Sequence, residues 1–435
     1  MLDELRRAAA RQRAHHQLRS LVVGCQRLLS ERGETNSMAI ARQLVERIDT
    51  LPPDLLGGFF DHLSLALSPE PKRVLQAAQA YAEQPNAQQL IALTQAAEPP
   101  RQELLRRLNR TPGGTATLVR LRRALLPRLA KQPEWLALEA DLLHLFSSWF
   151  NPGFLQMRRV DWNSPAKLLE KIIHHEAVHE IDGWDDLRRR LQPDRRCFAF
   201  FHPQLPDEPL IFVEVALLPD MPAAIAPLID KASEPLSPER FRVAAFYGIS
   251  NCEPGLRNVS LGNFLIKSVA EQLQRELPRV RSFCTLSPIP GFAAWLLSGP
   301  DFAALPRLRR PAAADLEAAR AHLLKACNGE LGALQRAATH EALDPQAEAA
   351  LLSLCAAYLL YQSPTPQGDP VARFHLDNGA RLERLNARGN MSAKGLKQAF
   401  GLMVNYLYDL DKIEASHEKF KQGEVARSRA VHSVL

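Results

Sequence analysis

The sequence predicts an α+β fold in which an all-helical N-terminal domain, residues 1–150, precedes a mixed α/β domain, residues 151–435, with a helical insertion at about 312–361. Three observations support this prediction. Apolar residues recur at helical spacing before residue 150, short runs rich in aromatic and β-branched residues begin after it, and an alanine- and leucine-rich stretch interrupts those runs. A chain of 435 residues is long enough for two or three domains.

The N-terminal region has the pattern of successive amphipathic helices separated by breakers. In "HQLRSLVVGCQRLLSER" one helical face is formed by Leu18, Leu21, Val22, Cys25, Leu28 and Leu29. The segments "TATLVRLRRALLPRL" and "EWLALEADLLHLFSSWF" repeat the pattern, and the breakers are "LPPD", "SPEP", "AEPP" and "RTPGG". Since no motif here carries chemistry, we expect an interaction or oligomerisation domain.

Strand-like runs characterise the second half. "CFAFF", "LIFVEVALL", "RVAAFYGIS" and "RSFCTLS" are rich in aromatic and β-branched residues, as strands are. "VARFHLDNGARLERLN" is predicted to be a β-hairpin with Asn378-Gly379 as its turn, because tight hairpin turns favour residues that tolerate positive φ. A final helix is predicted over "SAKGLKQAFGLMVNYLYDL".

Composition limits the classes of function. The formal net charge is +6, from 54 basic and 48 acidic residues, which suits a mildly basic surface or an anionic small ligand better than a nucleic acid. The 6 cysteines are scattered, so we expect a reducing, cytoplasmic compartment. No run of about 18 apolar residues occurs, so no membrane span is expected. The N-terminus lacks the apolar core of a secretory signal, and its early Asp3 and Glu4 make a poor organelle transit peptide.

The segment "KIIHHEAVHEIDGW" contains a match to H-E-x-x-H at His175-Glu176-Ala177-Val178-His179. On a helix this spacing places two imidazoles one turn apart, where they can hold zinc, with the glutamate as general base. A third ligand is missing, because no histidine follows at the metzincin spacing and the next glutamate downstream, Glu208, is in a proline-rich loop. We therefore predict no metal site and interpret these histidines, with His174, as the solvated end of a helix that reaches Asp182-Gly183.

A candidate anion site lies between "RVAAFYGIS" and the amphipathic helix "LGNFLIKSVAEQLQREL". A loop that enters a helix aims several backbone N–H groups at one point, and the helix N-terminus adds about half a positive charge, which suits a pyrophosphate. The spacing Arg257-x-x-Ser260-x-Gly262 resembles the coenzyme A loop of the GNAT acetyltransferase superfamily, with serine in place of the first glycine. A helix that is merely well capped is the alternative.

Two further segments place polar residues beside rigid turns. "FCTLSPIPGFAAWL" puts Ser287 at a strand end before Pro288-Ile289-Pro290-Gly291, and "VARFHLDNGA" puts His375 just before the predicted hairpin turn. From their positions alone, Ser287 could be a turn former and His375 a structural histidine. Together with "FYGISNCEPGLRNVSLGNFLIK" and "GLMVNYLYDL", these segments resemble the malonyl-CoA decarboxylase family over about residues 145–410.

The resemblance implies a GNAT-like catalytic domain that converts malonyl-CoA to acetyl-CoA and carbon dioxide without a separate cofactor. It implies Ser287 and His375 as catalytic serine and histidine, the serine orienting the carboxylate and the histidine donating a proton, and Tyr408 as an active-site tyrosine. The coenzyme A contacts that it implies are Arg257, Asn258, Val259, Ser260, Leu261, Gly262 and Asn263. A dimer or tetramer is expected. Ala166 stands where animal members have a cysteine used between subunits, so such crosslinking is not expected.

Two other functions remain open at this stage. A coenzyme A-dependent N-acyltransferase would use the same loop but would need a base and an open groove for an amine. A helical binding protein with a decayed site would show no turnover. Decarboxylation of malonyl-CoA without an acceptor separates the three.

Overall fold

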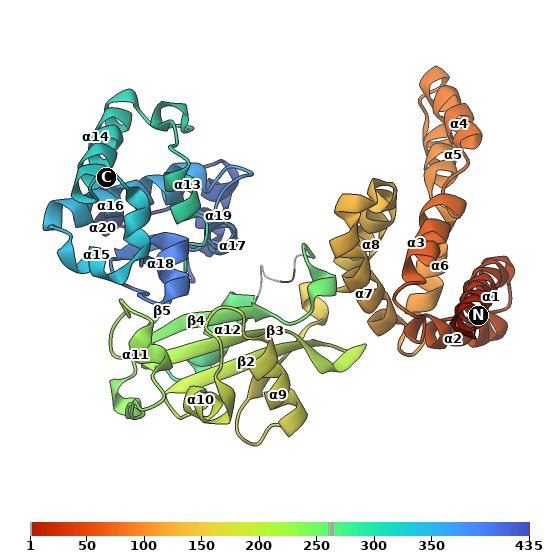
Figure 1. Ribbon diagram of the computed structural model, residues 1–435, viewed down its shortest axis with the longest axis horizontal. Coiled ribbons are helices and arrows are strands. Elements are labelled where there is room, and N and C mark those ends of the chain that lie inside the picture. The colour runs from red at the N-terminus through yellow and green to blue at the C-terminus, as the bar shows by residue number, and fades with distance from the viewer. Residues whose placement is uncertain (1, 260, 262–264) are drawn as a thin grey trace. The chain divides into compact units, whose positions relative to one another are not determined.

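The computed structural model describes residues 2–259, 261 and 265–435. The chain forms two compact units (Figure 1). The first, called here the helical unit, contains Met1–Leu155, Phe201–Glu208 and Glu253–Ser260; the second, the sheet unit, contains Gln156–Phe200, Pro209–Cys252 and Leu261–Leu435. The predicted fold class, a helical region followed by a mixed α/β region with a helical insertion, is confirmed.

The helical unit forms because apolar residues recur every three or four positions and so share one face. Its core takes residues from several helices, such as Leu28, Leu44 and Leu104. The helices are α1 (Leu2–Ser30), α2 (Glu34–Asp49), α3 (Leu56–Asp61), α4 (Pro71–Glu83), α5 (Ala87–Ala97), α6 (Pro100–Asn109), α7 (Gly114–Leu125) and α8 (Leu136–Trp149). Within the described residues, no helix of the chain is both long enough and apolar enough to cross a membrane.

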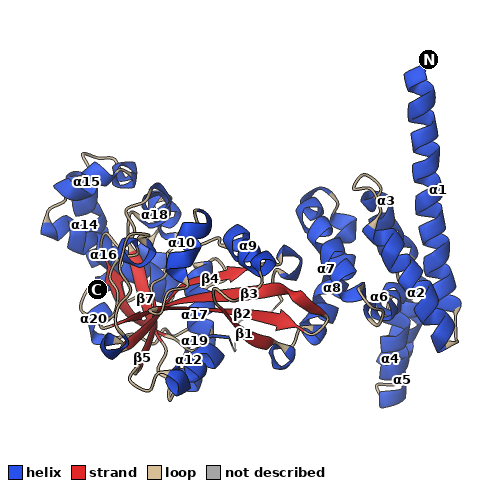
Figure 2. Cartoon of the chain, turned by 90° about the horizontal axis from the view of Figure 1, so that it is seen from below, coloured by secondary structure: helices blue, strands red, loops and turns tan. Residues whose placement is uncertain are grey.

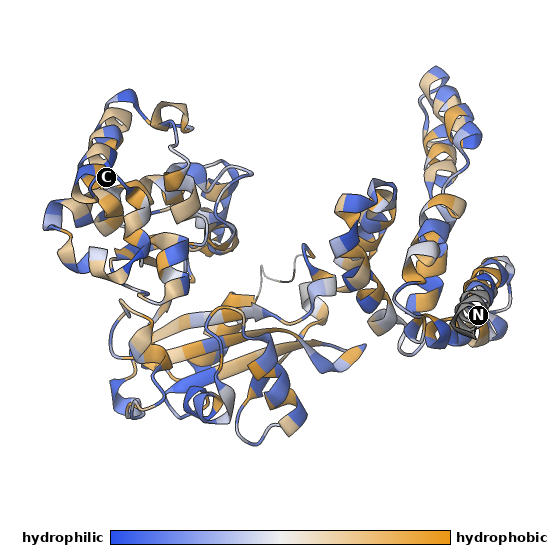
Figure 3. Ribbon diagram, in the orientation of Figure 1, coloured by the Kyte–Doolittle hydropathy of each residue, from blue (hydrophilic) through white to orange (hydrophobic). Residues whose placement is uncertain are grey.

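A mixed sheet of seven strands, in the order β1-β2-β3-β4-β5-β7-β6, forms the centre of the second half. Its strands are β1 (Gln156–Val160), β2 (Arg195–His202), β3 (Leu205–Leu218), β4 (Val243–Asn251), β5 (Ser282–Thr285), β6 (Arg381–Asn386) and β7 (Met403–Leu407). Strands β4 and β5 are parallel, whereas the pairs β3–β4, β5–β7 and β6–β7 are antiparallel. A parallel pair requires a crossover, and α12 (Leu265–Glu276) supplies it. Figure 3 shows hydrophobic residues concentrated along the strands.

Helices cover both faces of the sheet. Helices α9 (Ala166–His175) and α10 (Gly183–Arg190) lie on one face and α12 lies on the other (Figure 2). The remaining helices are α11 (Ala226–Ile229), α13 (Phe292–Leu297), α14 (Arg310–Ala326), α15 (Ala337–Ala342), α16 (Pro345–Ala357), α17 (Pro370–Asp377), α18 (Ala393–Ala399), α19 (Ile413–Lys421) and α20 (Arg429–His432). Helices α14 to α16 occupy most of the predicted helical insertion.

The predicted hairpin at residues 371–386 is wrong. Its first half is helix α17, and only its second half is a strand, β6. The Asp369 side chain caps the helix by accepting from the backbone N–H groups of Val371 and Ala372, and Pro370 takes the first turn. Gly379, with φ of 77°, follows the helix end. Asn378-Gly379 is therefore a helix C-terminal signal here, because the same positive φ serves both structures.

The predicted final helix is also wrong in its second half. Helix α18 ends at Ala399, and β7 follows at Met403–Leu407. Phe400 and Gly401 adopt φ of 51° and 77°, which no right-handed helix can continue through. Tyr408 therefore directly follows a strand.

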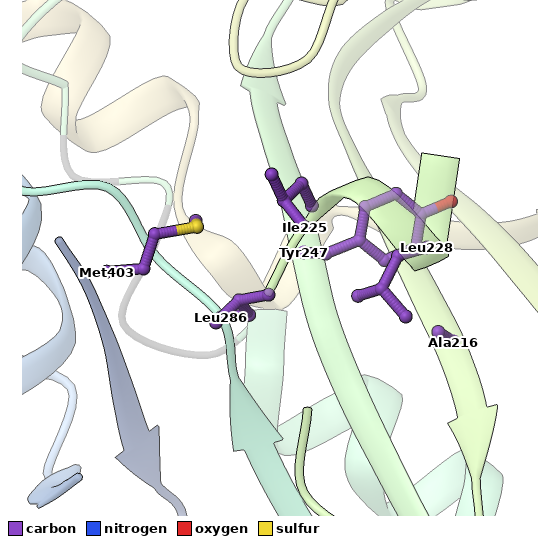
Figure 4. Packing of buried hydrophobic residues seen from close by; sticks show 6 residues of the cluster. All are labelled: Ala216, Ile225, Leu228, Tyr247, Leu286 and Met403. Atoms are coloured by element: carbon purple, nitrogen blue, oxygen red, sulfur yellow. The ribbon is translucent and has the colours of Figure 1, made fainter. Parts of the chain in front are cut away.

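Two hydrophobic clusters cover one face of the sheet at β5 and β7, and polar side chains lie on the other. Leu286 and Met403 pack with Ala216, Ile225, Leu228 and Tyr247 in one hydrophobic cluster (Figure 4). Cys284, two positions before Leu286, packs in a second cluster against Leu407. Because side chains alternate along a strand, Thr285 and Ser287 point to the opposite face.

Candidate active site

Ser287 is held at the end of β5 by backbone pairing with β7. Its N–H donates to the carbonyl of Val404 at 2.8 Å, and the Val404 N–H donates back to the Ser287 carbonyl at 3.0 Å. The Leu286 N–H donates to the Phe246 carbonyl of β4 at 2.9 Å. The segment is thus fixed between two strands, and Ser287 is 5% exposed.

Ser287, His375 and Tyr408 form a continuous hydrogen-bonded chain. Oγ of Ser287 lies 3.0 Å from Nε2 of His375, and Nδ1 of the same imidazole lies 2.8 Å from the Tyr408 hydroxyl. The Tyr406 ring stacks on the imidazole, with centroids 4.7 Å apart. The structure therefore brings together the three residues that the sequence predicted to be catalytic, although 88 positions separate the serine from the histidine.

Burial determines the charge state of this hydrogen-bonded chain. It lowers the pKa of His375 from 6.5 to about 3, because a charged imidazolium loses its hydration there. It also raises the pKa of Tyr408 well above its ordinary value. At neutral pH the hydrogen-bonded chain consists of two hydroxyls and a neutral imidazole. None of these three groups carries a charge.

Asp369 connects the segments that carry His375 and Ser287. Besides capping helix α17, its carboxylate accepts from the Gly291 N–H at 2.9 Å, in the turn that follows Ser287. Since His375 lies in the last turn of α17, one buried carboxylate links the position of the serine turn to that of the histidine helix. Sequence reasoning missed Asp369, although an aspartate before proline is a recognisable helix start.

The predicted coenzyme A loop is described only in part. Arg257 and Asn258 are exposed, Asn258 has a φ of 66°, and Val259 and Leu261 are buried. Ser260, Gly262 and Asn263 lie outside the described residues. Positive φ at a non-glycine residue is uncommon. It marks the start of this loop as a tight turn rather than a continuous helix.

Arg122 anchors the segment that precedes this loop. Its buried guanidinium forms two hydrogen bonds to the Glu139 carboxylate, at 2.9 and 2.6 Å, and donates to the Gly255 carbonyl at 2.7 Å. A Cβ on Gly255 would lie 2.2 Å from the Val119 carbonyl oxygen, so only glycine fits. The signal for Arg122 was a charge inside the apolar pattern of "TATLVRLRRALLPRL", which sequence analysis did not use.

The H-E-x-x-H segment has a structural arrangement different from the one predicted. Helix α9 ends at His175, so the motif does not lie on one helix, and the interpretation as a solvated helix end is wrong for His179, which is buried beyond that end. Glu176 Oε1 accepts from the N–H groups of Val178 and His179, each at 2.7 Å. This glutamate folds the loop onto itself. Among the described residues, no group of three or more histidine, cysteine, aspartate or glutamate side chains is placed to hold a metal ion.

The same loop belongs to a buried ionic network. Arg190 forms ion pairs with Asp186 at 2.9 Å and with Glu214 at 3.2 Å. Glu176 Oε2 accepts from the Ser250 hydroxyl at 2.9 Å. Burial, opposed by Arg190, raises the pKa of Glu214 to about 8, and the nearby Glu176 adds to this rise. These carboxylates are therefore structural. Together with Arg190 they are called here the ionic network.

The fold and the site describe a protein in which a helical unit is joined to a unit built on a mixed seven-stranded sheet. The family model for the malonyl-CoA decarboxylase C-terminal domain matches residues 153–435, and that for its N-terminal domain matches residues 67–150. The chain belongs to the malonyl-CoA decarboxylase family.

Relatives and solved structures agree with this assignment. The mitochondrial malonyl-CoA decarboxylases of Anser anser anser and Mus musculus are each 37% identical to this chain over 71% of its length. The chain spans 64% and 65% of their lengths, slightly less than two thirds. A crystal structure described as malonyl-CoA decarboxylase from Rhodopseudomonas palustris is 46% identical, with a TM-score of 0.83, covering 96% of this chain and 99% of that one. One from Cupriavidus metallidurans is 34% identical, with a TM-score of 0.76, covering 97% and 100%.

Proposed function

We propose that the chain decarboxylates malonyl-CoA to acetyl-CoA and carbon dioxide. The observation that carries this proposal is the buried chain of Ser287, His375 and Tyr408, in which each contact is 2.8 to 3.0 Å long. Relatives that cover nearly all of this chain carry the name of that enzyme.

The proposed reaction needs few protein groups. Malonyl-CoA carries its carboxylate two bonds from a thioester carbonyl, so the electron pair left by departing carbon dioxide moves into that carbonyl as an enolate. The thioester is itself the electron sink, and the proposal includes no metal, biotin or pyridoxal. The protein has to hold the coenzyme A handle, orient the carboxylate in a dry site and deliver one proton to the enolate carbon.

Ser287 is proposed to hydrogen-bond the malonyl carboxylate and turn it out of the carbonyl plane. His375 is proposed to donate the proton from Nε2. The low pKa of His375 opposes protonation, but a malonyl carboxylate beside Nε2 would favour the imidazolium through its negative charge. Binding of malonyl-CoA would then take up one proton, the same proton that the enolate consumes when it becomes acetyl-CoA.

The loop from Arg257 to Asn263 is proposed to bind the coenzyme A pyrophosphate. Replacing Gly262 with valine should weaken both malonyl-CoA and acetyl-CoA, because both carry the same handle. Calorimetry with acetyl-CoA measures this without turnover, and unchanged affinity in a folded Gly262→Val protein would refute the assignment.

The deciding experiment is mass spectrometry of the acyl-CoA products after incubation of malonyl-CoA with the purified chain and no acceptor. Acetyl-CoA formed in step with carbon dioxide release supports the proposal. A malonylated amine, formed only when an amine is added, would instead indicate an N-acyltransferase. No product at all would leave a binding protein.

A further inference from the structure

The carboxyl group of Asp369 is buried between the turn that follows Ser287 and the helix that carries His375, and each of its oxygens binds one of them. Oδ1 accepts from two backbone N–H groups in the first turn of α17, each at 3.0 Å. Oδ2 accepts from the Gly291 N–H at 2.9 Å. The residue is 1% exposed. The catalytic roles proposed above give this carboxyl group no part.

Both connections from this carboxyl group to the reacting side chains are short and stiff. On one side, Gly291 is four positions after Ser287, and two of the three residues between them are prolines, whose rings fix φ. On the other side, His375 is six positions after Asp369, along a single continuous helix. A shift of the carboxyl group relative to either segment would therefore change the distance between the serine hydroxyl and the imidazole.

Gly291 allows the carboxyl group to approach this turn closely. A Cβ on this residue would lie 2.2 Å from the Tyr358 hydroxyl oxygen and 3.4 Å from Oδ2 of Asp369. Its φ of −94° lies in the right-handed region that other residues also adopt, so the Tyr358 side chain excludes a larger residue. Tyr358 is 2% exposed, and the Trp295 ring packs against it at 5.0 Å between centroids. The contact between Gly291 and Asp369 therefore has little room to shift.

Helix capping alone does not require a buried carboxyl group, as a second Asp-Pro start in the same chain shows. Asp344 precedes Pro345 and caps α16 by accepting from the Ala347 N–H at 2.8 Å, yet its side chain is 55% exposed. Asp369 caps α17 in the same way but is buried, and burying a carboxyl group is costly unless its oxygens are bound. The feature that distinguishes Asp369 is therefore its link to Gly291.

We infer that Asp369 is a positioning residue for decarboxylation, whose carboxyl group sets the distance between the Ser287 hydroxyl and the His375 imidazole by binding the segments that carry them. The inference rests on the proposed function. In that reaction the serine holds the malonyl carboxylate and the histidine protonates the carbon next to it, so both must reach one malonyl group at the same time. Displacing a reacting group by about 1 Å can lower a rate about a hundredfold.

Asp369→Ser tests the inference from the helix side. Serine caps a helix about as well as aspartate does, but its one side-chain oxygen cannot also bind the Gly291 N–H. We expect kcat to fall roughly tenfold, with the affinity for acetyl-CoA little changed, because the link concerns the acyl end of the substrate. Asp344→Ser is the matched control at the other Asp-Pro cap, and its kcat should stay within about twofold of wild type.

Gly291→Ala tests the inference from the serine side. The added methyl group meets the Tyr358 hydroxyl and should push the turn away from Asp369, so kcat should again fall roughly tenfold. Adding Tyr358→Phe removes the oxygen that the methyl group meets and should restore most of the lost kcat. Gly332→Ala is the control, because a Cβ there would meet no described atom within 4 Å, and it should leave kcat unchanged.

A double-mutant cycle separates positioning from general structural damage. If Asp369 acts through His375, adding Asp369→Ser to a His375→Asn protein should change kcat by less than about twofold. Damage that is independent of His375 would lower kcat by roughly the same tenfold again. Crystal structures of the single variants give the distance itself, and we expect Oγ of Ser287 and Nε2 of His375 to lie further apart than 3.0 Å. Thermal melting shows which variants are folded, and if Asp369→Ser is not, Gly291→Ala carries the test.

Three results would overturn the inference: wild-type kcat in the folded single variants, losses that multiply in the cycle, or an unchanged distance between Ser287 and His375 in the variant crystals. A failure of the proposed function is separate, since it appears as a wild type that releases no carbon dioxide. The crystallographic distance needs no turnover, so it decides whether Asp369 sets the contact in either case.

Discussion

Two buried polar networks of the sheet unit differ in charge, and they lie on opposite faces of the sheet. The ionic network around Arg190 and Glu214 lies on the face of Ala216 and Tyr247, whereas Ser287, His375 and Tyr408 lie on the other. The first is built around the Arg190 guanidinium, which pairs with the carboxyl groups of Asp186 and Glu214. The second holds hydroxyls and a neutral imidazole.

The difference shows why only one network is suited to chemistry. Buried ions are tolerated when they are paired within the protein, and the groups that pair them are no longer available to a ligand. Neutral polar groups cost less to bury, and their hydrogens can be redirected when a charged substrate arrives. The ionic network therefore belongs to the fold of the loop at residues 176–179, whereas the neutral chain remains available to the anionic acyl group of the proposed reaction.

Removing Arg190 should have the largest effect on stability. In an Arg190→Met protein the carboxylates of Asp186 and Glu214 remain buried without their partner, so the free energy of unfolding should fall by about 3–5 kcal/mol. Arg188 is on the same helix but exposed, and Arg188→Met should cost less than about 1 kcal/mol. Urea denaturation measures both, and equal losses would mean that the network is not structural.

Removing His375 should have the largest effect on turnover. A His375→Asn protein loses the proposed proton donor, so kcat should fall by roughly a hundredfold or more, with acetyl-CoA affinity little changed. His174→Asn is the control, because that histidine is exposed on helix α9. Steady-state kinetics and calorimetry are the measurements. Near wild-type turnover in His375→Asn would contradict the donor role.

A smaller loss is expected when only the outer end of the neutral chain is cut. Tyr408→Phe removes the hydroxyl that lies 2.8 Å from Nδ1 of His375, and kcat should fall roughly tenfold. Tyr81→Phe, in helix α4 of the helical unit, should change nothing. If Tyr408→Phe kept full turnover, Tyr408 would have no part in orienting the imidazole.

Buried histidines and the buried Glu214 should give the free energy of unfolding opposite pH dependences, and this is the mildest effect. Burial raises the pKa of Glu214 from 4.5 to about 8, so the folded state binds more protons between these values. It lowers the pKa values of His375 and His179 from 6.5 to about 3, so there the unfolded state binds more. The histidines should therefore increase the free energy of unfolding as pH rises from about 3 to 6.5. Glu214 should decrease it as pH rises from about 4.5 to 8.

Denaturation at several pH values tests this sign. Glu214→Gln should flatten the decline between about pH 6.5 and pH 8, where the two histidines no longer contribute. Glu234→Gln, at an exposed site, should keep the decline. A Glu214→Gln protein with the wild-type slope in that window would show that Glu214 titrates normally.

Much of the fold and part of the site followed from local sequence. The strands β2 to β5 were predictable because aromatic and β-branched residues suit a pleated, buried surface, and Ser287 was predictable because a strand followed by Pro288 must turn there. The family resemblance, rather than local pattern, selected Ser287, His375 and Tyr408 as site residues, and local pattern gave only the position of Ser287 at a strand end. Local pattern alone assigned His375 and Tyr408 to the wrong elements.

Tertiary structure decided the rest, because those outcomes depend on partners that are distant in sequence. Asn378-Gly379 suits a hairpin turn or a helix end equally well, and the capping of α17 by Asp369 made it a helix end. Glu176 suits a zinc helix or a loop, and the Ser250 hydroxyl and two local N–H groups made it a loop anchor. Thr285 is 121 positions from Tyr406, so no local pattern could show that its hydroxyl accepts the Tyr406 N–H. Propensity acts over neighbouring residues, whereas hydrogen-bond satisfaction in a core is decided only once distant strands have met.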